Sequence, residues 1–304
     1  MTGSAPPPVA GRAELLRALG AVASSPPPQC RPAAAGLGLP VPTAAEHTAV
    51  FVLSAPPHAA IHLGGEGKLG GEGLDRAAGF WRVLGLSPPA DADHLGALLM
   101  LYAELGDAET AARGEAARGQ LRRARETLLW EHLWSWAPGY LTAVRRLGTP
   151  SLGAWAQLTL RALARETRLC TASTGLPLAL RAAPPLLSPD RAGGTGDGDG
   201  HLLDLLLAPV RSGVLLTRED LREAAETAGA GCRLGERRYT LQAMLDQDTA
   251  ATLGWLSGFA RRWACWHIQQ QPVPGADPRR WWADRAAGTA AVLRQLQRQF
   301  VTAG

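Results

Sequence analysis

The 304-residue sequence has almost no lysine and no long apolar run. Lys68 is its only lysine, so arginine supplies nearly all of the 31 basic residues, and 27 acidic residues are scattered among them to leave a net charge of +4. Because long runs of like charge are missing, the charge pattern does not predict nucleic-acid binding. No window approaches the roughly 18 apolar residues of a membrane span, and the N-terminus lacks the basic and apolar regions of a signal peptide. We therefore expect a cytoplasmic protein without stable membrane insertion.

Metal-ligating residues are also sparse. The histidines show no HExxH or HxH spacing, which predicts no metal site and no metal cofactor. The cysteines stand too far apart in sequence for a CxxC pair or a zinc ribbon, and a chain of this length does not need disulfide staples. We expect buried free thiols at the four positions, Cys30, Cys170, Cys232 and Cys265.

Glycine-rich segments suggest two ligand-binding loops, but neither motif is complete. The segment 64–71 resembles a phosphate-binding P-loop, yet His62 and Leu69 stand where that motif needs glycine and a hydroxyl residue. The segment 193–200 alternates Gly and Asp without the register of an EF-hand. No GxSxG or dinucleotide fingerprint is present either. These absences predict that the protein is not an enzyme.

Apolar residues at spacings of three and four predict helices along most of the chain. Asp91 or Asp93 is expected to cap one of them, which Gly106 ends. Pro138 is expected to end a longer one, and Thr217 with Asp220 forms an approximate capping box. The expected helices cover residues 12–22, 49–53, 75–84, about 93–105, 108–136, 150 to about 171, 201–207, 217–228, 239–270 and 278 onward.

The clearest stripe of apolar residues lies in the segment 239–270 and is expected to be buried; it comprises Leu253, Leu256, Ala260, Trp263 and His267. Without a convincing hairpin or βαβ alternation, the pattern predicts an all-α helical bundle of roughly eight to ten helices. A flexible N-terminal tail is expected over 1–10. A disordered insert rich in Gly and Asp is expected over about 184–200, and helices on both sides of it leave open whether it interrupts one bundle or divides two halves.

Two segments contain residue types that could form a functional site. Asp93 and His94 pair a carboxylate with an imidazole, as general acid-base catalysis requires, but adjacent residues at a helix start point apart. In the segment 131–140, Glu131, His132, Trp136 and Tyr140 collect near Pro138 at the end of a predicted helix. Helical periodicity alone explains this second group, because the same residues are typical of the well-packed end of a helix.

The same residues resemble a known family. Glu131-His132-Leu133 followed by Trp136 and Pro138 resembles the EHLxxWxP signature of the TorD/DmsD/NarJ family of redox-enzyme maturation chaperones. The segment 89–96 resembles that family's EPxDHL stretch and keeps the Asp-His-Leu core, although Ala90 and Asp91 replace the usual Glu and Pro. The segment 56–62 stands where members often carry a Pro-Tyr-Glu-Ser-like turn.

This resemblance implies a single all-helical domain over residues 1–304 that has no catalytic residues and no cofactor. It further implies that the protein binds the twin-arginine leader of a molybdopterin oxidoreductase, or the apo-subunit itself, and delays export until the cofactor is inserted. A homodimer is also expected to be possible. Such a leader presents two arginines and an apolar stretch, which require carboxylate and aromatic walls. By residue type, the leader-binding residues would be Trp81, Asp93, His94, His132, Trp136 and Tyr140.

Two alternatives stay open at this stage. One is a helical enzyme in which Asp93, His94 and His132 converge on a pocket. The other is a helical scaffold that has kept the fold but lost leader binding, which the departures at Ala90 and Asp91 suggest.

Overall fold

The computed structural model describes residues 9–171, 173–186, 198–231, 235–270, 272 and 275–303. About 73% of the chain is helical, and the described residues form sixteen α-helices and two π-helical segments but no strand. The all-α prediction is therefore confirmed, whereas the predicted number of helices is too low. The count is higher because the predicted helices over 108–136 and 239–270 are divided, and because helices over 31–36, 59–63, 137–146, 178–181 and 209–212 were not predicted.

The first half of the chain contains the elements α1 (Val9–Ser24), α2 (Arg31–Gly36), α3 (Ala44–His47), η1 (Thr48–Ser54), α4 (Ala59–Leu63), α5 (Gly71–Val83), α6 (Leu95–Ala111), α7 (Glu115–Thr127), η2 (Leu128–Trp134) and α8 (Ala137–Arg146). The second half contains α9 (Pro150–Leu169), α10 (Leu178–Arg181), α12 (Gly198–Leu207), α13 (Pro209–Ser212), α14 (Arg218–Ala228), α15 (Arg237–Gln247), α16 (Thr249–Gln269) and α17 (Pro278–Ala303).

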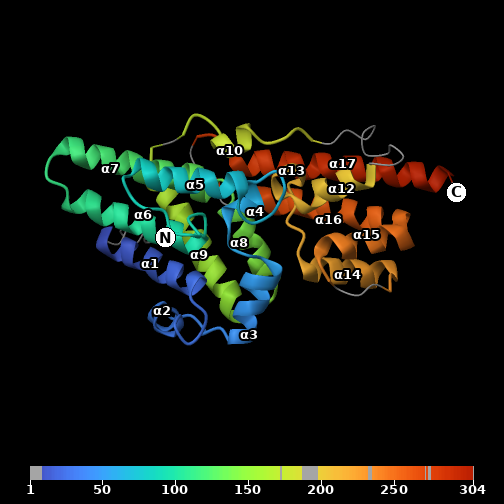
Figure 1. Cartoon of the computed structure of the whole chain (residues 1–304), viewed down its shortest axis with the longest axis horizontal. Coiled ribbons are helices and arrows are strands. Elements are labelled where there is room, and N and C mark those ends of the chain that lie inside the picture. Colours follow the sequence, from blue (N-terminus) through green and yellow to red (C-terminus); the bar gives the residue numbers. More distant parts are fainter. Residues whose placement is uncertain are drawn as a thin grey trace, which may run out of the picture.

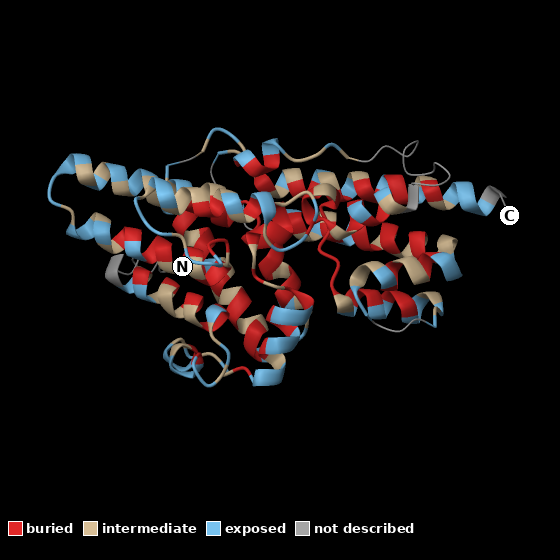
Figure 2. Ribbon diagram, in the orientation of Figure 1, coloured by how far each residue is buried: buried red, intermediate tan, exposed pale blue. Residues whose placement is uncertain are grey.

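Helices from the two ends of the sequence lie at opposite ends of the molecule (Figure 1). α1, α6 and α7 lie at one end and α14 to α17 at the other, with α4 and α8 between them. The most extensive packing is between α16 and α17 and between α1 and α6. One hydrophobic core nevertheless runs through the whole arrangement, since Leu19 of α1 and Leu293 of α17 belong to the same buried cluster. Figure 2 shows these buried residues along the middle of the molecule, whereas α7 contributes none.

The long helix predicted over residues 108–136 is wrong. α6 continues through Gly106 to Ala111, and the break comes at Gly114, whose φ of 101° lies in the left-handed region that favours glycine. Beyond α7 the backbone widens into the π-helical η2. Pro138 does not end this segment but lies in the first turn of α8, where its missing N–H costs no hydrogen bond.

The predicted helix over 239–270 is likewise two helices, α15 and α16, which meet at Asp248. Asp248 leaves the helical conformation and its side chain accepts a hydrogen bond from the Ala251 N–H, so it caps α16. The apolar stripe in α16 is buried as predicted. The capping box of Thr217 and Asp220 at the start of α14 is also confirmed.

The segments predicted to be flexible lie partly outside the described residues. Residues 1–8 and 187–197 are not described, and α1 already begins at Val9. α12 begins at Gly198, so the last residues of the predicted disordered insert are helical. The three described cysteines, Cys30, Cys170 and Cys265, are free thiols, but only Cys30 is buried. Within the described part of the chain, no helix is long and apolar enough to cross a membrane.

Candidate functional site

The turn that precedes α6 is joined to the turn that precedes α4. The Leu95 N–H donates to the Pro57 carbonyl at 2.8 Å, and the Ala59 N–H donates to the Asp93 carbonyl at 3.1 Å. His58 and His94 thereby form an isolated antiparallel bridge. Two segments that the family resemblance singled out, 56–62 and 89–96, are thus adjacent in space.

Asp93 lies at the centre of this junction, with only 2% of its surface exposed. One carboxylate oxygen accepts a hydrogen bond from the Ala60 N–H at 2.8 Å, and the other lies 3.3 Å from His58 Nδ1. Burial raises the pKa of Asp93, but these two hydrogen bonds outweigh burial and lower its pKa overall. Because Ala60 is in the first turn of α4, Asp93 caps α4 from a distant part of the sequence.

His94, rather than Asp91 or Asp93, caps α6. Its Nδ1 accepts a hydrogen bond from the Gly96 N–H at 3.0 Å, so the predicted aspartate cap is wrong. The bond requires an unprotonated Nδ1, and burial, followed by the charge of His58, lowers the pKa of His94 to about 4. The rings of His94 and His58 meet edge to face at 5.0 Å. His94 is half-buried.

The end of α5 packs against the same junction. The Trp81 indole N–H donates to the Ala92 carbonyl at 3.3 Å, and the Trp81 ring is half-buried. Leu84 lies one turn later and is also half-buried, while Leu86 and Asp91 are exposed. The structure therefore brings Trp81, Asp93 and His94 together beside an exposed carboxylate and exposed apolar surface.

Trp136 and Tyr140 form a second group, in the interior. Both are at most 1% exposed, and the Trp136 ring stacks on His62 of α4 with 4.9 Å between centroids. The Tyr140 ring meets the same imidazole at 5.3 Å. The Tyr140 hydroxyl and both His62 ring nitrogens are buried without a hydrogen-bond partner. Burial, followed by the charge of Arg237, lowers the pKa of His62 to about 3.

His132 belongs to neither group. It is 8% exposed and packs against Phe80 of α5 at 4.8 Å between ring centroids. Burial, followed by the charge of Arg76, lowers its pKa to about 4. No contact joins His132 to Asp93 or His94, and the described residues contain no group of three His, Cys, Asp or Glu side chains that could hold a metal. The enzyme alternative, which needs these three residues in one pocket, gains no support from this placement.

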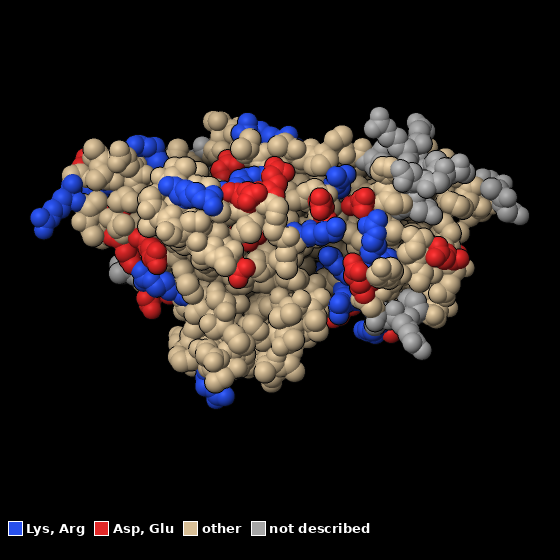
Figure 3. All heavy atoms as spheres, in the orientation of Figure 1, with Lys and Arg blue, Asp and Glu red and all other residues tan. Residues whose placement is uncertain are grey.

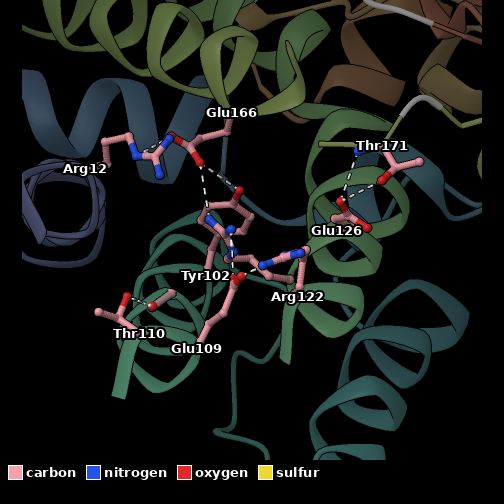
Figure 4. Close-up of polar contacts among 10 residues, drawn as sticks. Arg12, Tyr102, Glu109, Thr110, Arg122, Glu126, Glu166 and Thr171 are labelled. Carbon is pink, nitrogen blue, oxygen red and sulfur yellow. Dashed lines mark hydrogen bonds and ion pairs between the residues drawn. The ribbon is translucent and has the colours of Figure 1, made fainter. Parts of the chain in front are cut away.

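A buried charge network around Glu166 had no signal in the sequence (Figure 4). Glu166 of α9 is 3% exposed and accepts a hydrogen bond from the Tyr102 hydroxyl at 2.9 Å. Arg12 and Arg125 lie 3.8 Å and 3.6 Å from its carboxylate oxygens, and Arg125 also pairs with Glu109 at 2.9 Å. These residues come from four helices, so no local spacing connects them. The network ties α1, α6, α7 and α9 together.

Comparison with known families identifies the segment that contains the candidate site. Residues 39–141 match the sequence model of a family described as nitrate reductase delta subunit. The match includes the junction at Asp93, the end of α5 and the interior group of Trp136 and Tyr140. It confirms the resemblance that the two motifs predicted. No curated protein sequence matches the chain.

Proposed function

We propose, on the premise that residues 39–141 belong to the nitrate reductase delta subunit family of NarJ/TorD-type chaperones, that this protein is a cytoplasmic, non-enzymatic chaperone for a molybdenum-containing oxidoreductase. It binds the apo-subunit, including its twin-arginine leader, until the cofactor has been inserted. Maturation of molybdoenzymes is the activity for which the family is known. A homodimer is compatible with this function.

The surface beside Asp93 carries the proposal. Trp81 of α5 and Leu84 directly after its end, with exposed Leu86, offer an apolar wall to the apolar stretch of a leader. Exposed Asp91 offers a carboxylate to its arginines, and a guanidinium can lie on the half-exposed Trp81 ring. His94 borders this surface at the start of α6.

The buried residues have a different part in the proposal. Both carboxylate oxygens of Asp93 already contact the protein, one through the Ala60 N–H of α4 and the other through His58. Asp93 therefore holds the turns around the recognition surface in place and does not itself bind the arginines of the leader. His132, Trp136 and Tyr140 support the site from the interior, because a peptide cannot reach side chains this deeply buried unless helices separate. The proposed recognition surface is therefore formed by Trp81, Leu84, Leu86, Asp91 and His94.

The test is affinity capture of the tagged full-length protein from its native cytoplasm, followed by mass spectrometry and by titration with the leader peptide so identified. Asp91→Asn removes the exposed carboxylate, and Asp284→Asn, on the exposed face of α17, removes one charge elsewhere. We expect an unprocessed molybdenum oxidoreductase with its leader, about tenfold weaker leader binding by Asp91→Asn, and unchanged binding by Asp284→Asn. Recovery of general chaperones alone would refute the proposal.

A further inference from the structure

A groove of about 470 Å³ lies between α8, α9 and α16, and it shares no residue with the surface beside Asp93. Its volume is in the range of binding sites for small molecules and short peptide segments. Its walls combine arginine, amide and tryptophan side chains. They are formed by Trp134, Thr142, Arg145, Arg146, Gln157, Leu160, Arg161, Ala164, Trp266, Gln269 and Gln270.

The charge of this groove has one sign, since no acidic residue lines it. Arg146 is already satisfied, because it pairs with buried Asp220 at 2.9 Å and lies over the Trp266 ring at 4.1 Å. Arg145 and Arg161 are exposed and have no carboxylate partner among the described residues. Two unpaired guanidinium groups therefore face a single concave surface.

A second hollow shows the contrast. It measures about 370 Å³ and is lined by Lys68, Arg211, Arg237 and Arg238 together with Glu66, Asp204 and Glu236. One of its cations, Arg238, is paired with Asp204 at 2.7 Å. Basic and acidic groups likewise lie side by side over the face drawn in Figure 3. Of these two hollows in the described part of the chain, the groove at α8, α9 and α16 is the one whose cations have no acidic residue beside them in its lining.

The same groove presents neutral hydrogen-bonding groups beside its arginines. Gln157, on α9, is half-buried, and Gln269, at the end of α16, is exposed. Each side-chain amide offers both a donor and an acceptor. Such groups match the carbonyl and N–H groups of an extended peptide backbone. Trp134 forms part of the wall, but it is 2% exposed and contributes packing only.

We propose that this groove binds an acidic, extended segment of the client polypeptide, separate from its leader. This inference rests on the proposed function, because it takes the client to be a polypeptide held by the chaperone. Arg145 and Arg161 pair with client carboxylates, and the side-chain amides of Gln157 and Gln269 bind its backbone. A leader with two arginines is repelled from this groove and attracted to Asp91, so the two sites select different parts of one client.

The test uses the full-length protein and a fluorescein-labelled peptide of repeated Glu-Ala units, with a peptide of repeated Gln-Ala units as the neutral control. The variant Arg145→Glu/Arg161→Glu reverses the groove's charge. Its matched control, Arg123→Glu/Arg294→Glu, makes the same change of net charge at exposed positions on α7 and α17. Fluorescence anisotropy measures peptide affinity at low and high salt.

We expect the Glu-Ala peptide to bind at least about tenfold more tightly than the Gln-Ala peptide, and the difference to shrink at high salt. Reversal of Arg145 and Arg161 should abolish this preference, whereas the matched control should change it less than about twofold.

Equal loss in the two charge-reversed variants would overturn the inference, because it would mean that net charge alone attracts the peptide. Complete displacement of the peptide by equimolar inorganic pyrophosphate would also overturn it, in favour of a small-anion site. Leader binding is measured separately and should be unchanged in Arg145→Glu/Arg161→Glu. Failure of the wild-type protein to bind any leader would refute the proposed function, while the preference for Glu-Ala would still decide the chemistry of the groove.

Discussion

Replacement of His62 by Phe should stabilise the protein, and the gain should grow as the pH falls. His62 is 4% exposed, stacks on Trp136 with an interplanar angle of 12°, and forms no hydrogen bond of normal geometry through either ring nitrogen. The Pro56 backbone opposes the fall in the pKa of His62, but burial outweighs it. A buried polar group without a partner costs about 1 to 3 kcal/mol. Phe keeps the stack on Trp136 and removes both nitrogens, but its larger ring costs some packing energy. We therefore expect the free energy of unfolding at pH 8 to be about 1 to 2 kcal/mol higher than in the wild type.

The pH dependence follows from the lowered pKa of His62. Folding lowers that pKa from 6.5 to about 3, so between these values the unfolded imidazole binds a proton that the folded one does not. Stability is therefore lost as the pH falls from 6.5 toward 3. At pH 5 the loss is about 2 kcal/mol, because one pKa unit corresponds to about 1.4 kcal/mol. His62→Phe should escape this part of the acid destabilisation.

Urea unfolding at pH 8 and pH 5, followed by far-ultraviolet circular dichroism, measures both effects without relying on Trp136 fluorescence. His201→Phe replaces an exposed imidazole on α12 and controls for the loss of a histidine as such. The advantage of His62→Phe over the wild type should be about 2 kcal/mol larger at pH 5 than at pH 8. Equal differences at the two pH values would refute the reasoning, because they would show that His62 is protonated as readily in the folded protein as in the unfolded chain.

Further predictions concern the packing around the site, and thermal or urea unfolding checks each of them. Gly213→Ala should lower the free energy of unfolding by about 3 kcal/mol, because φ is 73° and an added Cβ would lie 2.5 Å from a backbone nitrogen of α17. Gly229→Ala should lower it by about 1 kcal/mol, because φ is similar at 67° but the space around an added Cβ is open. Equal costs would contradict the clash. Glu166→Gln should destabilise the protein by about 2 kcal/mol, because two arginines lose their common partner and Tyr102 keeps only a neutral acceptor. Asp93→Asn should cost about 1 kcal/mol through the weakened cap of α4.

The fold could be predicted from the sequence wherever a helix obeys local rules. The stripe of α16 and the capping box of Thr217 and Asp220 depend on residues within a few turns of one another, and both are confirmed. Helix ends were predicted less well. Gly106 lies inside α6 because tertiary packing overrides its low helix propensity, while Gly114, which the pattern did not mark, breaks the chain with a positive φ. Pro138 can begin or end a helix, and in this fold it lies in the first turn of α8.

The candidate site shows why the correct residues could be found while their roles could not. A family motif identifies Asp93 and His94 by type, and residue chemistry then suggests that the carboxylate meets a guanidinium. The carboxylate instead accepts from Ala60, more than thirty residues earlier in the chain, and the imidazole takes the capping position that an aspartate usually fills. Both assignments depend on the junction between the turns before α4 and α6, which no local spacing encodes. If leader recognition uses this junction, the exposed acidic group must therefore be sought beside Asp93, and Asp91, one of the two departures from the family pattern, is the residue that the fold leaves available.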